Sequence, residues 1–514
     1  MPSSNISSPS KKTTKLLFLI SLLVCLVLSL PVATPPNNAF YNIDPDIPYL
    51  ANGLSLTAVN QVSFTNHPGT PLIQFLSLSH IPLRALSKIA KRPFIPLALE
   101  NYSYLVWYHR LIMFFLFTFS LFCLTCIWRK ISMSIPAVIT GIGLTLLYSS
   151  IVALPTGIWA ESFLFALFPL WLLTYYLATI HPTSTRLLLL GSITGVMLAT
   201  KFTSLSLIIA SIIVILFEKD SQKKLTAKLI SLCIFSLSTI EGFIVGTWPI
   251  VTKYPILFSW TKTLVSHANL YGKGATSVID PALYFRSLSA IVDNNQMMLL
   301  VTFTCILVLF LINAQKSLRW KALGIASLTG FAVLVKFQMD YYQIINYMGL
   351  ITVSVFVISR LRVKQQYILL AFISAYSLTG LIPKEQIMRK QVNESVKLAS
   401  FIKSRPQAGI IVWEWARSKE FALLWSKHWS GESLTPRINS LFPNLYSLDS
   451  LDTISGTSGK HPVMDICWNT LYIQKVSYPE FIKENPQAKN LPSEEIPDTS
   501  ILMVKNPQCT PTSP

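Results

Sequence analysis

Long apolar runs restrict most strongly what this chain of 514 residues can fold into. A helix needs about 20 apolar residues to cross the ~30 Å hydrocarbon core of a bilayer, and such runs recur between residues 16 and 382. Charged residues make up only 13% of the chain, about half of what soluble domains carry. We therefore predict an all-α polytopic membrane bundle, with spans at 16–32, 107–128, 133–153, 162–180, 229–250, 298–314, 321–336, 343–359 and 366–382.

The apolar run at 187–217 is different, because it is too long for one span and carries Lys201 at its middle. A lysine at the centre of a single membrane helix would be costly. Two short helices that meet at Lys201 on the outer side fit the pattern better. Counting this pair, we expect about eleven spans.

Basic residues orient the predicted spans. Residues 1–15 carry three lysines directly before the first apolar run, which predicts a cytoplasmic N-terminus and a retained signal anchor, with a cleaved signal peptide as the alternative. Threading the chain from there puts Arg or Lys in every short inside loop, whereas the outer loops 33–106 and 251–297 hold few. The formal net charge of +19 is therefore mainly topological and does not indicate nucleic-acid binding.

The composition changes at Pro383, and the pattern predicts a small soluble α/β domain at 383–514 on the outer side. A Glu- and Lys-rich helical stretch is followed by strand candidates at 408–415 and 500–506. Residues 16–382 would then form the transmembrane domain. Cys467 and Cys509 are expected on the oxidising side, where they either form a disulfide or stay free.

Acidic residues are sparse before residue 383, and most of them fall on the predicted outer face. Acids are also simply tolerated there, which is the plainer explanation for any single one. In the first outer loop, Asp44 and Asp46 lie among prolines that we expect to keep this segment from becoming a helix. Two acids so placed could hold a divalent cation, or one could act as a general base while the other orients it. His67 follows in the same loop, before an amphipathic stretch at 72–89 that is expected to lie along the membrane surface.

These motifs, taken in order, resemble the GT-C superfamily of integral membrane glycosyltransferases, and within it the protein-mannosyltransferase-like and aminoarabinose-transferase-like branch. The resemblance covers about residues 16–360. Two departures stand out: the acids of the first loop are separated by Pro45 before Tyr49, where the family frequently has an adjacent Asp-Glu pair and a Tyr, and His-Pro-Gly replaces His-Pro-Pro. The segments that carry the resemblance are DPDIPY, NHPGTP, GIWAESFLFAL, GSITGVMLATKFTS and KFQMDYYQIINYMGL.

The resemblance implies that a hexose or pentose moves from a polyprenyl-phosphate donor to a glycan, lipid or protein acceptor on the outer face. A carboxylate would take the proton of the acceptor, and fixed cations would stabilise the leaving phosphate. Snorkelling of Lys201 to the headgroups is the plain alternative to phosphate binding. The implied catalytic residues are Asp44, Asp46 and His67; the implied phosphate ligands are Lys201, Arg110, Lys336 and Arg286; Glu161, Tyr49 and Tyr342 would support them; and Asp44, Asp46 and Glu161 could hold Mg or Mn, with no other cofactor expected.

Two other functions fit parts of the pattern. A multi-span transporter would also have a broken helix pair and buried acids, but alternating access requires neither the large first outer loop nor the outer tail, and the halves show no inverted repeat. A ligase or polymerase of lipid-linked oligosaccharides is closer and would differ in using a diphosphate-linked donor. The outer side could be a periplasm or an organelle lumen, and we expect a bacterial inner membrane.

Overall fold

The computed structural model describes residues 11–30, 40–42, 44–65, 69–217, 225–268, 274–311, 317–337, 339–404, 411–450, 453–456, 459–465 and 467–509. The chain divides into two compact units. Unit 1 contains Met1–Ser29, Thr65–Leu72 and Ile112–Glu385, and unit 2 contains Leu30–Phe64, Ile73–Leu111 and Gln386–Pro514.

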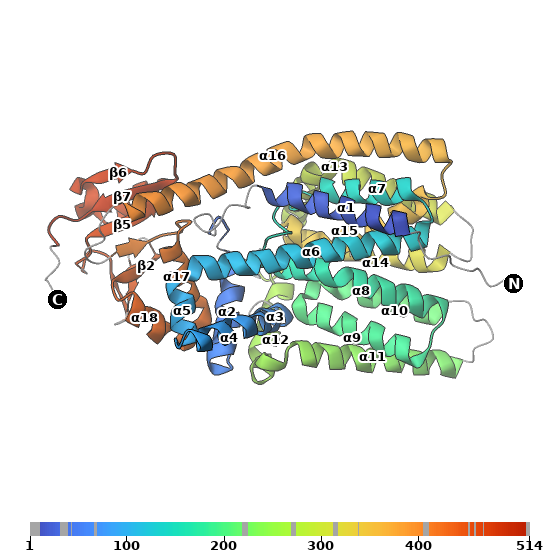
Figure 1. Ribbon diagram of the computed structural model, residues 1–514, viewed down its shortest axis with the longest axis horizontal. Helices are drawn as coiled ribbons and strands as arrows, with labels where there is room; N and C mark the ends of the chain where they lie inside the picture. The colour runs from blue at the N-terminus through green and yellow to red at the C-terminus, as the bar shows by residue number, and fades with distance from the viewer. Residues whose placement is uncertain are drawn as a thin grey trace. The chain divides into compact units, whose positions relative to one another are not determined.

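The predicted fold class is confirmed: the protein is a mostly helical, multi-pass membrane bundle with a small C-terminal sheet region (Figure 1). Within the described residues, eight helical segments are long and apolar enough to span a bilayer, and three shorter apolar helices accompany them. The long segments are α1 (Lys11–Ser29), α6 (Tyr102–Ser132), α8 (Ala160–Ile180), α11 (Leu225–Gly246), α13 (Pro281–Leu311), Leu318–Phe337, Asp340–Ile358 and α16 (Val363–Lys403), and the shorter ones are α7 (Ile135–Leu147), α9 (Ser184–Thr200) and Phe202–Phe217.

The break expected at Lys201 is confirmed. Helix α9 ends at Thr200, Lys201 has an extended backbone with φ −164° and ψ 134°, and a 3-10 turn, η2 (Phe202–Ser204), leads into α10 (Leu205–Phe217). The N–H of Lys201 makes the last hydrogen bond of α9, to the carbonyl of Met197 at 2.9 Å, and the helical pattern stops there. The two apolar halves of the run therefore become separate short helices. This places the lysine at a helix junction inside unit 1.

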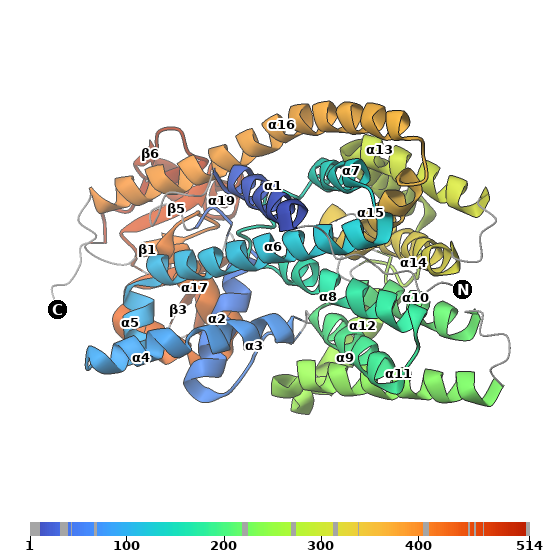
Figure 2. The same cartoon turned by 45° about the vertical axis from the view of Figure 1, so that its right-hand side comes forward.

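Helices α9 and α11 pack closely and fix the end of α9 that carries Lys201. Figures 1 and 2 both show the two helices side by side. A Cβ added at Gly195 would lie 2.1 Å from the carbonyl oxygen of Thr239, and one added at Gly242 would lie 2.2 Å from that of Ser192. Small residues that let helix backbones approach are the usual means of packing in a membrane, where no hydrophobic force drives helices together.

Unit 2 combines the first outer loop with the C-terminal region. Asn52 donates a hydrogen bond to the carbonyl of Trp429 at 3.1 Å, and the hydroxyls of Tyr102 and Ser426 lie 2.6 Å apart. Figures 1 and 2 show the resulting neighbours, α2 and α17, side by side. Unit 2 contains α2 (Asp46–Val59), the part of α3 (Thr70–Ser79) from Ile73 on, α4 (Ile81–Ile89), α5 (Phe94–Glu100), α17 (Lys419–Ser430) and α18 (Thr435–Leu441).

One local prediction in the first loop was wrong. The prolines were expected to keep the acidic segment from becoming a helix, but α2 begins at Asp46. Pro48 falls in its first turn, where a backbone N–H has no partner within the helix, so proline is tolerated there. Asp44 and Pro45 form the turn that precedes the helix.

The C-terminal region forms one seven-stranded mixed sheet in the order β4-β3-β2-β1-β5-β7-β6. The central strand β1 runs parallel to β2 and β5, and the other pairs are antiparallel. The core includes Val412, Trp468 and Phe481, and a disulfide joins Cys467 to Cys509. Both strand candidates are confirmed, as β1 and β7. The strands are β1 (Ile411–Trp413), β2 (Leu445–Ser450), β3 (Thr453–Gly456), β4 (Gly459–Pro462), β5 (Thr470–Gln474), β6 (Ser493–Glu495) and β7 (Ile501–Lys505).

Candidate functional site

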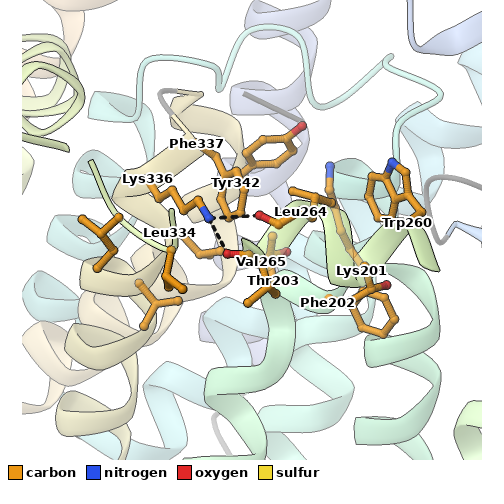
Figure 3. A pocket seen from close by; sticks show the side chains of 14 residues that line it. Lys201, Phe202, Thr203, Trp260, Leu264, Val265, Leu334, Lys336, Phe337 and Tyr342 are labelled. Atoms are coloured by element: carbon orange, nitrogen blue, oxygen red, sulfur yellow. Dashed lines mark hydrogen bonds between the residues drawn. The ribbon is translucent and has the colours of Figure 1, made fainter. Parts of the chain in front are cut away.

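Unit 1 contains a cavity of about 350 Å³ with a mainly apolar wall. Its lining comes from the junction after α9, from α12 (Tyr254–Ser266), and from the ends of α14 (Leu318–Leu334) and η6 (Val335–Phe337). Figure 3 shows Lys201 and Lys336 among the lining side chains. The cavity thus combines an apolar surface with two ammonium groups.

Lys201 is held by an acid and two aromatic rings. Its Nζ forms a buried ion pair with Glu161, in the first turn of α8, and lies 4.1 Å from the ring centre of Tyr342 and 5.5 Å from that of Tyr341. Only 9% of Lys201 is exposed. A snorkelling lysine would direct its ammonium to the headgroups and leave a buried carboxylate without a partner. These contacts instead fix the ammonium in the interior of unit 1.

Lys336 caps a helix end. Its Nζ donates hydrogen bonds to the carbonyls of Leu264 at 3.0 Å and Val265 at 2.8 Å, in the last turn of α12 (Figure 3). A cation is favourable at this end of a helix dipole. An ammonium has three donors, so one remains for a ligand in the cavity.

A buried polar cluster surrounds Asp340, at the start of the turn η7 (Asp340–Gln343) that also carries Tyr342. Asp340 accepts hydrogen bonds from Asn295 at 2.9 Å, from Tyr347 at 2.8 Å and from Ser149. Asp340 is one of the acids that fall on the predicted outer face, but nothing in the sequence indicates its partners. An acid in the KFQMDYYQ segment at the start of a span was the available signal, since such acids are usually paired.

Tyr148 lies between this cluster and the Lys201 pair. Its side chain is fully buried, and both Asp340 and Glu161 lie close enough to interact with it electrostatically. Its ring packs edge-on against that of Tyr347, with centroids 5.2 Å apart.

In unit 2, Asp46 and Arg110 form a buried ion pair with Oδ2 and Nη2 2.7 Å apart. Asp46 is fully buried, and Asn42 donates a hydrogen bond to its Oδ1 at 3.4 Å. The guanidinium of Arg110 lies over the Tyr41 ring, 3.9 Å from its centre. The carboxylate of Asp46 thus faces a fixed positive charge.

Asp44 has different surroundings from Asp46. It is exposed, and loss of part of the water around its carboxyl raises its pKa above the ordinary value. The two acids, equivalent by spacing, are therefore distinguished by burial. Tyr49 is buried on α2, and its ring packs edge-on against Phe64 with centroids 5.3 Å apart.

The remaining predicted site residues are not brought into either cluster. Arg286 is exposed on α13 and does not line the cavity, and His67 lies outside the described residues. Over the described ranges, no group of three or more His, Cys, Asp or Glu side chains is arranged to hold a metal ion. A divalent cation at Asp46 would have to share the carboxylate with the guanidinium of Arg110.

Comparison with known proteins shows a likeness in fold only. No family model and no curated protein matches the sequence. The chain is similar to the crystal structure of ArnT from Cupriavidus metallidurans bound to undecaprenyl phosphate, with 9% identity and a TM-score of 0.49 over 98% of this chain and 100% of that one. The apo structure of the same ArnT matches over the same shares with 9% identity and a TM-score of 0.47. At these values the likeness concerns the course of the chain and carries no inference about individual residues or ligands.

Proposed function

We propose that the protein is a membrane glycosyltransferase that moves a sugar from a polyprenyl-phosphate donor to an acceptor on the outer face of a bacterial inner membrane. The observation that carries the proposal is the cavity of unit 1, in which an apolar wall meets Lys201 and Lys336. An isoprenoid chain needs an apolar surface, and its phosphate needs fixed cations that also face little water. Few other ligands require both in a membrane-embedded unit.

Lys201 is proposed to bind the phosphate of the donor. Negative charge develops on this group as its bond to the anomeric carbon breaks, and a preorganised donor contributes about 3–4 kcal/mol to stabilising such charge. Glu161 and the ring of Tyr342 hold the ammonium in place. Lys336 would add its remaining donor.

Asp44 is proposed as the general base. It is exposed, as an acceptor requires, and its raised pKa makes it a better proton acceptor than an ordinary aspartate. The acceptor hydroxyl gives its proton to Asp44, the oxygen forms a bond to the anomeric carbon, and the bond from that carbon to the phosphate oxygen breaks. Polyprenyl phosphate leaves with the bonding electron pair. A divalent metal at Asp44, Asp46 or Glu161 stays a prediction, and it would supply further charge stabilisation.

The donor half of the proposal is tested by ligand binding. Native mass spectrometry of the detergent-solubilised protein would compare undecaprenyl phosphate with undecaprenol and undecaprenyl diphosphate. We expect a preference for the monophosphate that Lys201→Ala abolishes and Lys262→Ala, at an exposed position outside the cavity lining, retains. A preference for the diphosphate would favour the ligase or polymerase instead, and equal binding of undecaprenol would contradict a phosphate site.

The transfer itself is tested in membranes. Undecaprenyl-phosphate mannose and undecaprenyl-phosphate aminoarabinose, each labelled in the sugar, would be followed into endogenous acceptors. Label should reach an acceptor with the wild type and not with Asp44→Asn. Repeating the assay with EDTA and then with added Mn²⁺ decides whether a metal takes part. Transfer by Asp44→Asn at the wild-type rate would exclude the proposed base.

A further inference from the structure

We infer that Arg417, in the C-terminal region, is a positioning residue for the acidic cluster of the first outer loop. The inference rests on the proposed function, because it gives the cluster of Asp44 and Asp46 a part in sugar transfer. It assigns the C-terminal region a task in that reaction. All of the residues concerned belong to unit 2.

Arg417 is anchored on two sides. Its Nη1 forms an ion pair with the carboxylate of Glu394, and its Nε donates a hydrogen bond to the carbonyl of Tyr41 at 3.0 Å. Glu394 is itself held, because its Oε1 accepts hydrogen bonds from the backbone N–H of Ser500 at 2.8 Å and from the Ser500 hydroxyl. Ser500 directly precedes β7, so the sheet fixes the guanidinium that holds Tyr41.

Tyr41 passes this restraint to the acidic cluster. Its ring is buried and lies under the guanidinium of Arg110 at 3.9 Å, which is a cation–π contact. Arg110 in turn pairs with Asp46 at 2.7 Å. The sheet, Arg417, Tyr41 and Arg110 therefore form one continuous series of contacts that ends at the carboxylate beside Asp44.

The type of residue at 417 matters for this role. A guanidinium is planar and presents several N–H groups in fixed directions, so it can serve a carbonyl and a carboxylate at once. A lysine has one ammonium on a flexible stem and would not hold both partners in one geometry. The side chain of Arg417 is 32% exposed, so a small guanidinium compound can reach its position from water.

The experiment compares Arg417→Ala, Tyr41→Leu and the double variant. Tyr41→Leu removes the ring beneath Arg110 but keeps the carbonyl that Arg417 binds. We expect each single variant to lower kcat for sugar transfer by about 10- to 100-fold, with the donor KM and the unfolding midpoint close to wild type. The double variant should be no worse than either single one, because both break the same series of contacts. Ethylguanidinium should restore part of the activity of Arg417→Ala, and Arg417→Lys should remain impaired.

Lys397→Gln serves as the control, since Lys397 forms an exposed ion pair with Asp498 in the same unit. It should behave as wild type. Three results would each overturn the inference. The first is a double variant whose loss in kcat is the product of the two single losses. The others are an unchanged kcat in Arg417→Ala, and a loss of kcat that follows the unfolding midpoint and is not restored by ethylguanidinium. If the wild type transfers no sugar, the proposed function fails. Amide hydrogen exchange at the start of α2 then still tests the series of contacts: it should be faster in Arg417→Ala and in Tyr41→Leu, with no further increase in the double variant.

Discussion

The Nζ of Lys201 lies 4.1 Å from the ring centre of Tyr342 while its charge is paired with Glu161. A cation held by a carboxylate and a ring is fixed in position and still carries a face that an anion can approach. Both partners come from other helices, so the ammonium position depends on the packing of unit 1. Lys201 therefore differs from the basic residues of the inside loops, which set the membrane topology, because its ammonium is fixed by contacts with other side chains.

Removing the ammonium should abolish most of the transfer. Lys201→Ala is expected to lower the rate by about 100- to 1000-fold, because one preorganised donor to the developing charge is lost. Tyr342→Leu should have a smaller effect, of about 0.5–2 kcal/mol, because it removes only the cation–π contact. Initial rates at saturating donor measure both. A Lys201→Ala enzyme with normal kcat would exclude a role at the phosphate.

The hydrogen bonds of Asp340 should matter for the stability of the protein. Tyr347→Phe deletes one hydrogen bond to the half-buried carboxylate of Asp340, and we expect it to lower the free energy of unfolding by about 1–3 kcal/mol. The control is Tyr284→Phe, whose hydroxyl bonds to the carbonyl of Ala332 at 2.9 Å in an exposed place. Thermal unfolding in detergent compares the two. Equal midpoints would show that the cluster is not a structural constraint.

The pH dependence of transfer should report Asp44. A base must be deprotonated, and the loss of part of the water around its carboxyl raises the pKa of Asp44. The rate should therefore rise with pH and reach its plateau at a higher pH than an ordinary aspartate, with a pKa of about 3.9, would give. This rise of the rate with pH should be absent from the residual activity of Asp44→Asn. A plateau that begins at or below the ordinary pKa would contradict this assignment.

The two acids of the first loop should differ in their effect on stability. A raised pKa means that folding disfavours the charged form of Asp44, so its contribution to stability is greatest at low pH and falls as pH rises through the unfolded and then the folded pKa. At neutral pH, the thermal unfolding midpoint of Asp44→Asn should therefore equal or exceed that of the wild type. Asp46→Asn should lower the free energy of unfolding by about 3–5 kcal/mol, because it leaves the buried guanidinium of Arg110 without its counter-charge. A lower unfolding midpoint for Asp44→Asn than for Asp46→Asn would show that burial does not determine the different effects of these two residues on stability.

The disulfide should stabilise unit 2. Cys467 and Cys509 are 42 residues apart, and closing a loop of this length contributes about 4 kcal/mol in the chain-entropy account. Cys467→Ser/Cys509→Ser should therefore be degraded faster in limited proteolysis of the C-terminal region. Cys123→Ser/Cys126→Ser, at two free cysteines of α6, should leave the proteolysis pattern unchanged.

The spans could be predicted because lipid imposes a length and a composition on each segment separately. The helix junction at Lys201 could be predicted for the same reason, because an apolar run that is too long for one span and has a lysine at its middle fits few arrangements other than two short helices. The partners could not be predicted. Asp46 pairs with Arg110, and Asp340 accepts hydrogen bonds from Asn295 and Tyr347, only once the chain has folded. No local sequence pattern indicates these contacts. The start of α2 was missed because prolines in a first turn look the same in sequence as prolines that prevent a helix.

The composition of unit 2 has a consequence for biogenesis. Its two main parts are separated along the chain by residues 112–385, so the ribosome must deliver that whole stretch before α17 can reach α2. During synthesis, the amide of Asn52 lacks its bond to the carbonyl of Trp429, and the hydroxyl of Tyr102 lacks its bond to Ser426. The first loop therefore completes its folding late, and a chain stopped after Glu385 would display an unfinished surface to the quality-control proteases of its compartment.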